Sequence, residues 1–290
     1  MIPAAFDYLS PSTVQEALSA LSEHGDEAKL IAGGQSLLPV LRMRLNAPGV
    51  VIDLGGIDSL RGISEEGDDL VIGAMTTHHE VRTSDLVRRH ATVLAKATDE
   101  VADAQIRHRG TLGGALAHAD PAGDQGGAVL SLGARLTVAG PGGERTVPAD
   151  EFFLGLFETA VGEDEILTSI RIPKHTGWGA HYAKFVRIAH QWPIVAVAAS
   201  VRLEDGAIAE ARVGLTNMGS TYLRAGAVEQ ALVGRRPTEE ELSDVATLAV
   251  EGTDPPSDLN GDADYRRHLA GVLTRRAVLA AAAAPEPGAE

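Results

Sequence analysis

Two glycine pairs, Gly33-Gly34 and Gly113-Gly114, are the residues of this sequence whose type and spacing point most directly to chemistry. Glycine has no side chain, so the backbone can approach a phosphate closely and direct its N–H groups at the oxygens. Each pair precedes a segment that can form a helix, whose N-terminal dipole also favours an anion. Two such turns indicate one long ligand that carries phosphates. Either pair alone is more often a tight connection between a strand and a helix.

The first turn is expected to lie between a short strand at residues 29–32 and a helix that begins near Leu37. Pro39 would stand in the first helical turn, where helix N–H groups have no partner within the helix. Ser36 would then lie near the N-cap. Its hydroxyl could accept a helix N–H or bind a phosphate oxygen, and the two roles are compatible.

Polar residues are dense around the second turn. Thr111 can donate its hydroxyl, and Arg107 and Arg109 can offset anionic charge, while Asp120 and Asp124 can accept hydrogen bonds from sugar or polyol hydroxyls. In the plainer interpretation, Asp120 begins a turn and the arginines face solvent. The sequence lacks the P-loop pattern and a G-x-G-x-x-G after the first strand, so P-loop and Rossmann sites are not expected. The turns alone leave FAD, NAD and a nucleoside triphosphate open.

The segments that must position these turns alternate between helix and strand. A capping pattern at residues 12–15 precedes an apolar helical face that ends at Gly25. An amphipathic helix is expected near residues 92–104 and would include Val101. A turn at residues 140–143 indicates a hairpin. Strands are expected at residues 50–54, 70–72, 135–139 and 166–172.

The polar stretch at residues 173–177, which contains proline and glycine, is expected to be the main domain boundary. Beyond it, Asp205-Gly206 lies between two apolar segments and predicts a hairpin of strands 194–203 and 207–216. Helices are expected to begin near residues 225, 239 and 262.

Composition limits the possible functions. A chain of 290 residues, 44% of them hydrophobic, can bury a substantial core in about two domains, and its net charge of −15 disfavours binding to nucleic acid or anionic lipid. The absence of cysteine excludes disulfides, cysteine-ligated iron–sulfur clusters and a cysteinyl flavin link within this chain. A metal site is not expected, because the adjacent pair His78-His79 points in different directions. No signal peptide or membrane span is recognised, so a cytoplasmic location is expected.

The sequence resembles the FAD-binding medium subunits of the molybdenum hydroxylases, the carbon monoxide dehydrogenase and xanthine dehydrogenase group. The resemblance runs in order through residues 31–39, 51–54, 72–78, 105–114, 120–124, 165–167, 184–187, 264–269 and 275–277. It implies an α+β fold. An FAD-binding domain of the PCMH or vanillyl-alcohol oxidase-like type would occupy residues 1–175, in subdomains of about 1–57 and 58–175. A smaller α+β domain would occupy residues 176–290.

The resemblance also implies a site in which non-covalent FAD lies extended between the two subdomains, with its pyrophosphate across both turns. Asp124 would lie on the ribityl or ring side, Leu167 against the flavin ring, and Lys184 near the isoalloxazine. A cation there would stabilise the negative charge of reduced flavin. Without the resemblance, Lys184 reads as a solvent-facing strand lysine and Val101 as helix core. The implied cofactor-binding residues are Ala32, Gly33, Gly34, Gln35, Ser36, Val101, Thr111, Leu112, Gly113, Gly114, Ala115, Asp120, Asp124, Leu167 and Lys184.

Two positions depart from the family pattern. Ala115 stands where the family usually has asparagine, which removes one side-chain hydrogen bond but is expected to leave the backbone N–H for a phosphate. The family often has an acidic residue before the aromatic residue at this point, whereas here Gln191 precedes Trp192. No role that needs a charge is therefore assigned to this position. His78 lies in a stretch that starts a helix in the family, and a capping or packing role is expected for it.

The resemblance implies an electron-transfer subunit without a catalytic residue of its own. Its FAD would take electrons from an iron–sulfur small subunit, after a molybdenum-binding large subunit has oxidised the substrate, and pass them to an external acceptor. The molybdenum cofactor and the iron–sulfur clusters would belong to those partners, in a dimer of heterotrimers. Two alternatives stay open: a self-contained flavin oxidase with its own acid–base pair, and a flavin-free assembly subunit, which Ala115 alone favours. Valine at Gly33 or Gly113 is expected to abolish FAD binding and leave the chain folded.

Overall fold

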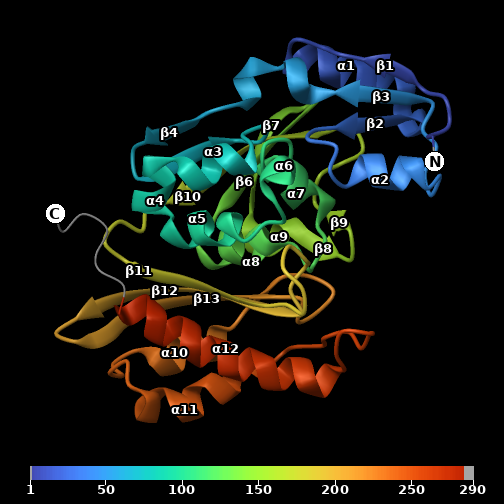
Figure 1. Ribbon diagram of the computed structural model, residues 1–290. Helices are drawn as coiled ribbons and strands as arrows, with labels where there is room; N and C mark the ends of the chain where they lie inside the picture. The colour runs from blue at the N-terminus through green and yellow to red at the C-terminus, as the bar shows by residue number, and fades with distance from the viewer. Residues whose placement is uncertain (1, 284–290) are drawn as a thin grey trace.

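The molecule has three levels, each built around one of three sheets (Figure 1). The structure is a computed structural model that describes residues 2–283. The N-terminal level is a parallel sheet in the order β1-β3-β2, formed by β1 (Asp7–Leu9), β2 (Ala28–Ile31) and β3 (Val50–Asp53). It carries α1 (Val14–His24) and α2 (Leu37–Arg42). Short 3₁₀ turns follow at Gly25–Glu27, Leu54–Gly56 and Asp58–Leu60.

Helix α1 confirms the predicted helix but not its predicted cap. Thr13 is the N-cap, and its hydroxyl accepts a hydrogen bond from the Glu16 N–H at 3.1 Å. The Glu16 carboxylate in turn accepts from the backbone N–H of Ser12 at 2.8 Å. The capping pair therefore uses Thr13 and Glu16, one residue later than the pattern read at residues 12–15. Gly25 ends the helix as predicted.

The middle level is an antiparallel sheet in the order β4-β5-β10-β6-β7, and it contains the predicted strands 70–72, 135–139 and 166–172. Its strands are β4 (Ile63–Glu66), β5 (Asp69–Gly73), β6 (Arg135–Gly140), β7 (Gly143–Pro148) and β10 (Ile166–Pro173). The helices of this level are α3 (His78–Thr83), α4 (Asp85–His90), α5 (Thr92–Asp99), α6 (Ala104–Arg107), α7 (Leu112–His118), α8 (Asp124–Ser131) and α9 (Ala149–Phe152). A small hairpin joins β8 (Phe153–Gly155) to β9 (Glu158–Thr159).

The predicted helix near residues 92–104 is too long. Helix α5 ends at Asp99, and Ala102 has φ +38°, a left-handed conformation that does not continue a helix. Val101 therefore lies in a loop between α5 and α6, not in a helical core.

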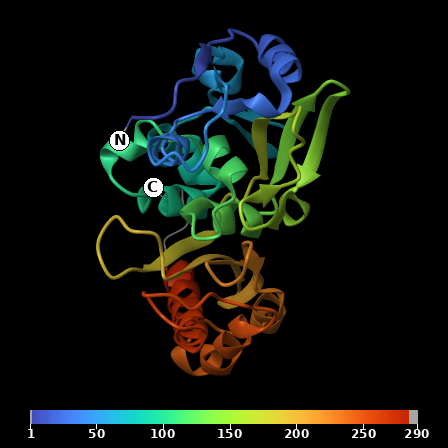
Figure 2. The ribbon, with the colours of Figure 1, turned by 90° about the vertical axis from the view of Figure 1, so that its right-hand side faces the viewer.

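The C-terminal level is an antiparallel sheet in the order β11-β12-β13-β14, covered on its outer face by helices (Figures 1 and 2). The hairpin predicted at Asp205-Gly206 is confirmed, and both residues have positive φ, as a tight hairpin turn needs. The three predicted helix starts are confirmed to within one residue. The elements are β11 (Gly179–Phe185), β12 (Val195–Glu204), β13 (Ala207–Thr216), β14 (Leu223–Arg224), α10 (Gly226–Leu232), α11 (Glu239–Thr247), a 3₁₀ turn at Leu248–Val250, and α12 (Ala263–Ala283). The predicted α+β fold is confirmed.

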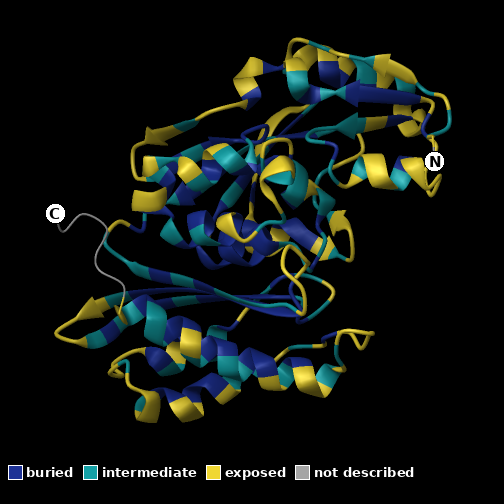
Figure 3. Cartoon of the chain, viewed as in Figure 1, coloured by how far each residue is buried: buried dark blue, intermediate teal, exposed yellow. Residues whose placement is uncertain are grey.

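Strand β12 joins the middle and C-terminal levels because both of its faces are buried (Figure 3). Ala196 and Ala198 pack into the core that contains α5 and α8, whereas Val195, Val197 and Ala199 pack into the core under α12. The alternation of a strand thus divides one segment between two cores. Small residues toward α8 permit close approach, and a Cβ at Gly214 would lie 2.0 Å from the Gly127 carbonyl oxygen. Helix α8, which begins at Asp124, is therefore held directly on the C-terminal sheet. Among the helices described, none is long and apolar enough to span a bilayer.

Candidate functional site

The first glycine turn, residues 32–36, connects β2 to α2 and leaves its backbone donors open. Gly34 has φ +75°, which glycine adopts without strain. Ser36 is at the N-cap position of α2, but its hydroxyl makes no capping hydrogen bond. Among the described residues, no acceptor receives the backbone N–H groups of Gly33, Gly34, Gln35 and Ser36. Successive free N–H groups ahead of a helix form a concave site for an anion.

The second turn, residues 111–115, uses most of its donors internally. Thr111 caps α7, accepting from the Gly114 N–H at 3.2 Å. The N–H groups of Leu112 and Gly113 donate to the carbonyls of Thr76 and Ala74, both at 2.9 Å. The expectation that the Ala115 N–H stays available is wrong, because this group donates to the Thr111 carbonyl at 3.0 Å. The two turns are therefore not equivalent clamps.

Both glycine pairs lie where backbones pack against each other. A Cβ at Gly33 would lie 2.1 Å from the Arg109 carbonyl oxygen, and one at Gly113 would lie 2.5 Å from the Ala74 Cβ. Gly33 thus packs on the backbone just before the second turn, whereas Gly113 packs on Ala74, which follows β5. Valine at either position would push backbone segments apart, so we expect such variants to lose stability as well as FAD.

A cavity of about 550 Å³ opens between the two turns. Leu112 is fully buried beneath its wall, while Val101, Asp120, Asp124 and Lys184 are outside its lining. Ten of the residues predicted to bind the cofactor line it: Ala32, Gly33, Gly34, Gln35, Ser36, Thr111, Gly113, Gly114, Ala115 and Leu167. The structure therefore brings both turns and Leu167 to one hollow and gathers most of the other predicted residues in a second place.

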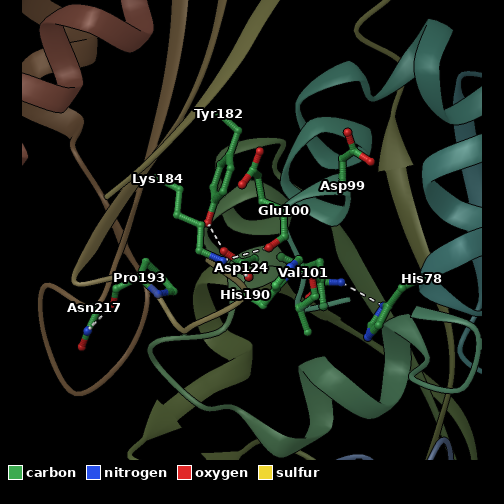
Figure 4. Close-up of polar contacts among 12 residues, drawn as sticks. His78, Asp99, Glu100, Val101, Asp124, Tyr182, Lys184, His190, Pro193 and Asn217 are labelled. Carbon is green, nitrogen blue, oxygen red and sulfur yellow. Dashed lines mark hydrogen bonds and ion pairs between the residues drawn. The ribbon is translucent and has the colours of Figure 1, made fainter. Parts of the chain in front are cut away.

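That second place is a buried ion pair between the first residue of α8 and strand β11 (Figure 4). Lys184 Nζ is 2.9 Å from Asp124 Oδ2, and their side chains are 4% and 8% exposed. Tyr182 donates its hydroxyl to Asp124 Oδ1 at 2.8 Å. Burial raises the pKa of Asp124 to about 6, although Lys184 and Tyr182 act in the opposite direction. The alternative of a solvent-facing Lys184 is wrong.

The loop of Val101 is fixed by side chains from three other segments. Lys184 donates to the Glu100 carbonyl at 2.9 Å, and His190 Nδ1 donates to the Ala102 carbonyl at 2.7 Å. Arg107 donates to the carbonyls of Val101 and Ala102 at 2.7 and 3.0 Å. Arg107 thus shapes this loop rather than facing solvent, and the loop joins the Lys184 pair to the segment that precedes the second turn.

Asp120 has a local structural role. Its Oδ1 accepts from the Ala122 N–H at 3.0 Å, which is the side-chain turn expected from an Asp-Pro sequence. Its carbonyl accepts from the Tyr222 hydroxyl at 2.5 Å. Gln191 and Trp192 belong to an exposed loop, and Trp192 is 68% exposed.

The cavity is also lined by residues that were not assigned to the site from the sequence. His78 is 5% exposed and lines the wall beside Gly110, and Phe157 stacks on His118 with ring centroids 5.0 Å apart. The helix start at His78 was expected, and the N-cap Thr77 with Glu80 forms a capping box there. No local pattern identifies Phe157, because the β8–β9 hairpin reaches the cavity only through the fold.

Replacing Thr111 with alanine tests whether the second turn serves a ligand besides its own helix. Loss of the N-cap is expected to lower the free energy of unfolding by about 1 kcal/mol. Thr238 is a matched control, because it caps α11 with a bond of 3.3 Å away from the cavity. Chemical unfolding should give similar costs for Thr111→Ala and Thr238→Ala. Only Thr111→Ala should weaken cofactor retention, and equal retention in both would remove Thr111 from the site.

Comparisons with known proteins agree with this architecture. The sequence model described as the FAD binding domain in molybdopterin dehydrogenase matches residues 4–175, and that of the CO dehydrogenase flavoprotein C-terminal domain matches residues 180–281. The chain is 40% identical to the carbon monoxide dehydrogenase medium chain of Hydrogenophaga pseudoflava, covering 97% of this chain and 98% of the relative. It is 37% identical to the nicotine 6-hydroxylase medium subunit of Paenarthrobacter nicotinovorans, covering 96% and 98%. A solved carbon monoxide dehydrogenase from H. pseudoflava matches with a TM-score of 0.94 and 42% identity, over 97% of this chain and 98% of that one.

Proposed function

The chain belongs to the FAD-binding medium subunits of the molybdenum hydroxylases, and from this premise we propose that its cavity holds the FAD pyrophosphate between the two glycine turns. The supporting observation is the run of N–H groups from Gly33 to Ser36, which have no acceptor within residues 2–283 and face a cavity that Thr111 also lines. These donors fit a diphosphate, because each of its oxygens accepts hydrogen bonds and its charge favours a helix N-terminus.

In this proposal the two turns, Leu167 and the residues around Lys184 have different roles in binding FAD. The first turn donates hydrogen bonds, and the second turn closes the cavity wall and places the Thr111 hydroxyl there. We assign Leu167 to an apolar wall of the cavity, where it excludes water from the bound cofactor. Val101, Asp124 and Lys184 would meet the flavin end, with Lys184 held at Asp124 and Glu100.

The bound FAD accepts electrons singly and releases them as a pair, which suits transfer between iron–sulfur clusters and a two-electron acceptor. As an oxidoreductase medium subunit, this chain works beside a large and a small subunit, which carry the molybdenum cofactor and the iron–sulfur clusters. We propose a dimer of such heterotrimers in the cytoplasm. We also propose a domain division after residue 175, supported by the start of the C-terminal sheet at Gly179.

The substrate is expected to be set by the large subunit. Relatives at 40% and 37% identity have names that specify carbon monoxide and nicotine, although both match this chain over nearly its whole length. Residues of the medium subunit therefore do not select among these substrates in the proposal.

The proposed function is tested by measuring the FAD, molybdenum and iron content of the native assembly, recovered through a tag on this chain. We expect one FAD per chain, with molybdenum and iron on co-purifying subunits, because this chain has no cysteine for a cluster. FAD without metals or partners would instead favour the self-contained oxidase. A native assembly without flavin would refute the cavity assignment and favour the assembly subunit.

A further inference from the structure

His78 is a buried imidazole to which the proposed function gives no role. It is the first residue of α3, where Thr77 and Glu80 form a capping box with backbone bonds of 3.2 and 2.8 Å. This cap fixes the start of the helix and therefore the base of the His78 side chain. The ring is 5% exposed and lines the cavity together with Gly110 and Thr111.

A single contact sets the proton position on this ring. Gln125 Nε2 donates to His78 Nδ1 at 2.9 Å, and Gln125 is itself 3% exposed. An amide nitrogen is only a donor, so Nδ1 must accept and carries no proton. The neutral imidazole then holds its proton on Nε2.

The Nε2 edge of the ring lies against Gly110, the residue before the second turn. A Cβ at Gly110 would be 2.7 Å from His78 Nε2, which shows how closely the two groups approach. Within residues 2–283, His78 Nε2 has no hydrogen-bond partner, yet it is not among the fully enclosed polar atoms. A donor on a side chain more than nine-tenths buried therefore borders the cavity without an acceptor.

The charges around the ring keep it neutral. Burial lowers the pKa of His78 to about 4, and the positive charge of Arg107 acts in the same direction. The cavity wall beside it, at Ala74, Met75, Gly110 and Thr111, has no titratable group. Two charges on the adjacent helices have other partners: Asp99 of α5 pairs with Arg82 of α3, and Glu80 of α3 bonds to Thr77.

We propose that His78, held by Gln125, is an additional phosphate-binding residue whose Nε2–H donates to a pyrophosphate oxygen between the glycine turns. This inference rests on the proposed function, because it assumes a diphosphate in the cavity. A neutral donor suits the position, since a buried imidazolium would carry a large desolvation cost. It also supplies a hydrogen bond on the side where the second turn uses its own N–H groups internally.

The first test measures FAD affinity of the full chain after removal of its flavin, by quenching of flavin fluorescence. His78→Phe keeps a ring but removes the donor, and we expect FAD affinity to fall by about 10- to 100-fold. His79→Phe is the matched control, because His79 stacks on His108 outside the cavity lining. Equal affinity of His78→Phe and the wild type would overturn the inference alone. A wild-type chain that binds no FAD would overturn the proposed function as well.

A second variant separates hydrogen bonding from packing. In Gln125→Glu, the new carboxylate accepts a hydrogen bond from Nδ1–H, so the neutral ring takes the Nδ1–H form and presents a lone pair at Nε2. FAD affinity should then be weak at pH 8 and rise as the pH falls and Nε2 is protonated again. In the wild type, whose His78 pKa is about 4, His78 should give no such gain between pH 8 and 6, and comparison with the wild type removes the effect of Asp124, whose pKa is about 6. A loss in Gln125→Glu that does not vary with pH would overturn the inference.

The proton position can also be read directly in the wild-type chain. A long-range ¹H–¹⁵N spectrum should show His78 as the Nε2–H form, assigned by the signal missing from His78→Phe. An Nδ1–H form would overturn the inference.

Discussion

Replacing Lys184 with methionine is expected to lower the free energy of unfolding by about 3 kcal/mol at pH 8. The reason is that the substitution leaves the Asp124 carboxylate buried without a counter-ion, in a place where both side chains are less than a tenth exposed. Methionine has nearly the volume of lysine, so the cost reflects the lost charge rather than a cavity. Urea unfolding of the chain, followed by circular dichroism, measures it.

The pH dependence of this cost is the sharper part of the prediction. Asp124 has a pKa of about 6 in the folded chain, against an ordinary 3.8, so the folded state binds this proton more tightly. The corresponding stability is complete below about pH 4 and is lost as the pH rises through 6. Removing Lys184 raises this pKa further. At pH 5 a protonated Asp124 needs no counter-ion, and the cost of Lys184→Met should be much smaller than at pH 8.

Lys174→Met is the matched control, because Lys174 pairs with Glu65 at 2.8 Å while the two side chains are 22% and 42% exposed. A pair so accessible to solvent should contribute much less than the buried pair. The double variant Lys184→Met/Asp124→Asn should recover most of the lost stability, since neither charge is then left alone. Equal costs for the two lysines, or a Lys184→Met cost that is the same at pH 5 and pH 8, would contradict the prediction.

The same variant tests the proposed place of Lys184 at the flavin. Without the cation, reduced flavin loses a stabilising charge, so Lys184→Met should lower the flavin reduction potential or weaken FAD binding. Spectroelectrochemical titration of the intact complex measures both. If potential and flavin content both match the wild type, Lys184 only stabilises the fold.

The parts of the fold that were predicted correctly carry local signals. The Asp205-Gly206 turn and the apolar strands around it are such a case, and the end of α1 at Gly25 is another. The helix expected near residues 92–104 fails for a reason outside its own sequence. Glu100, Val101 and Ala102 are compatible with a helix, but Lys184, Arg107 and His190 bind their three carbonyls from elsewhere in the fold. Such tertiary contacts override propensity.

In the candidate site, too, features with a local sequence signal were predicted and features set by tertiary contacts were not. The glycine pairs are visible in sequence, so both turns were predicted in place, whereas the capping role of Thr111 was not predicted. The direction of the N–H groups in the second turn was not predicted. The N–H groups of Leu112 and Gly113 donate to the carbonyls of Thr76 and Ala74, which are more than thirty residues away in the sequence. Burial of Lys184 likewise depends on strand β11 meeting the start of α8. His78 was considered only as a metal ligand or as a capping or packing residue, although its helix start was recognised.

Gly33→Ala is expected to give the largest loss of flavin among single-methyl substitutions, together with a stability cost of about 2–3 kcal/mol. The added Cβ would lie 2.1 Å from the Arg109 carbonyl oxygen and 2.7 Å from the Gly110 Cα. Both are backbone atoms, which cannot rotate aside as a side chain can. The first and second turns must therefore separate, and the cavity between them changes shape.

Gly142→Ala is the control for this substitution. Neither Gly33 nor Gly142 has a positive φ, so alanine is not strained by the backbone at either position, and a Cβ at Gly142 meets no atom within 4 Å. Flavin content and urea unfolding of both variants separate steric contact from the general effect of replacing glycine. Retention of FAD and full stability in Gly33→Ala would mean that the turns do not need this close contact. A loss confined to flavin, with stability unchanged, would mean that Gly33 serves the ligand directly rather than the packing of the two turns.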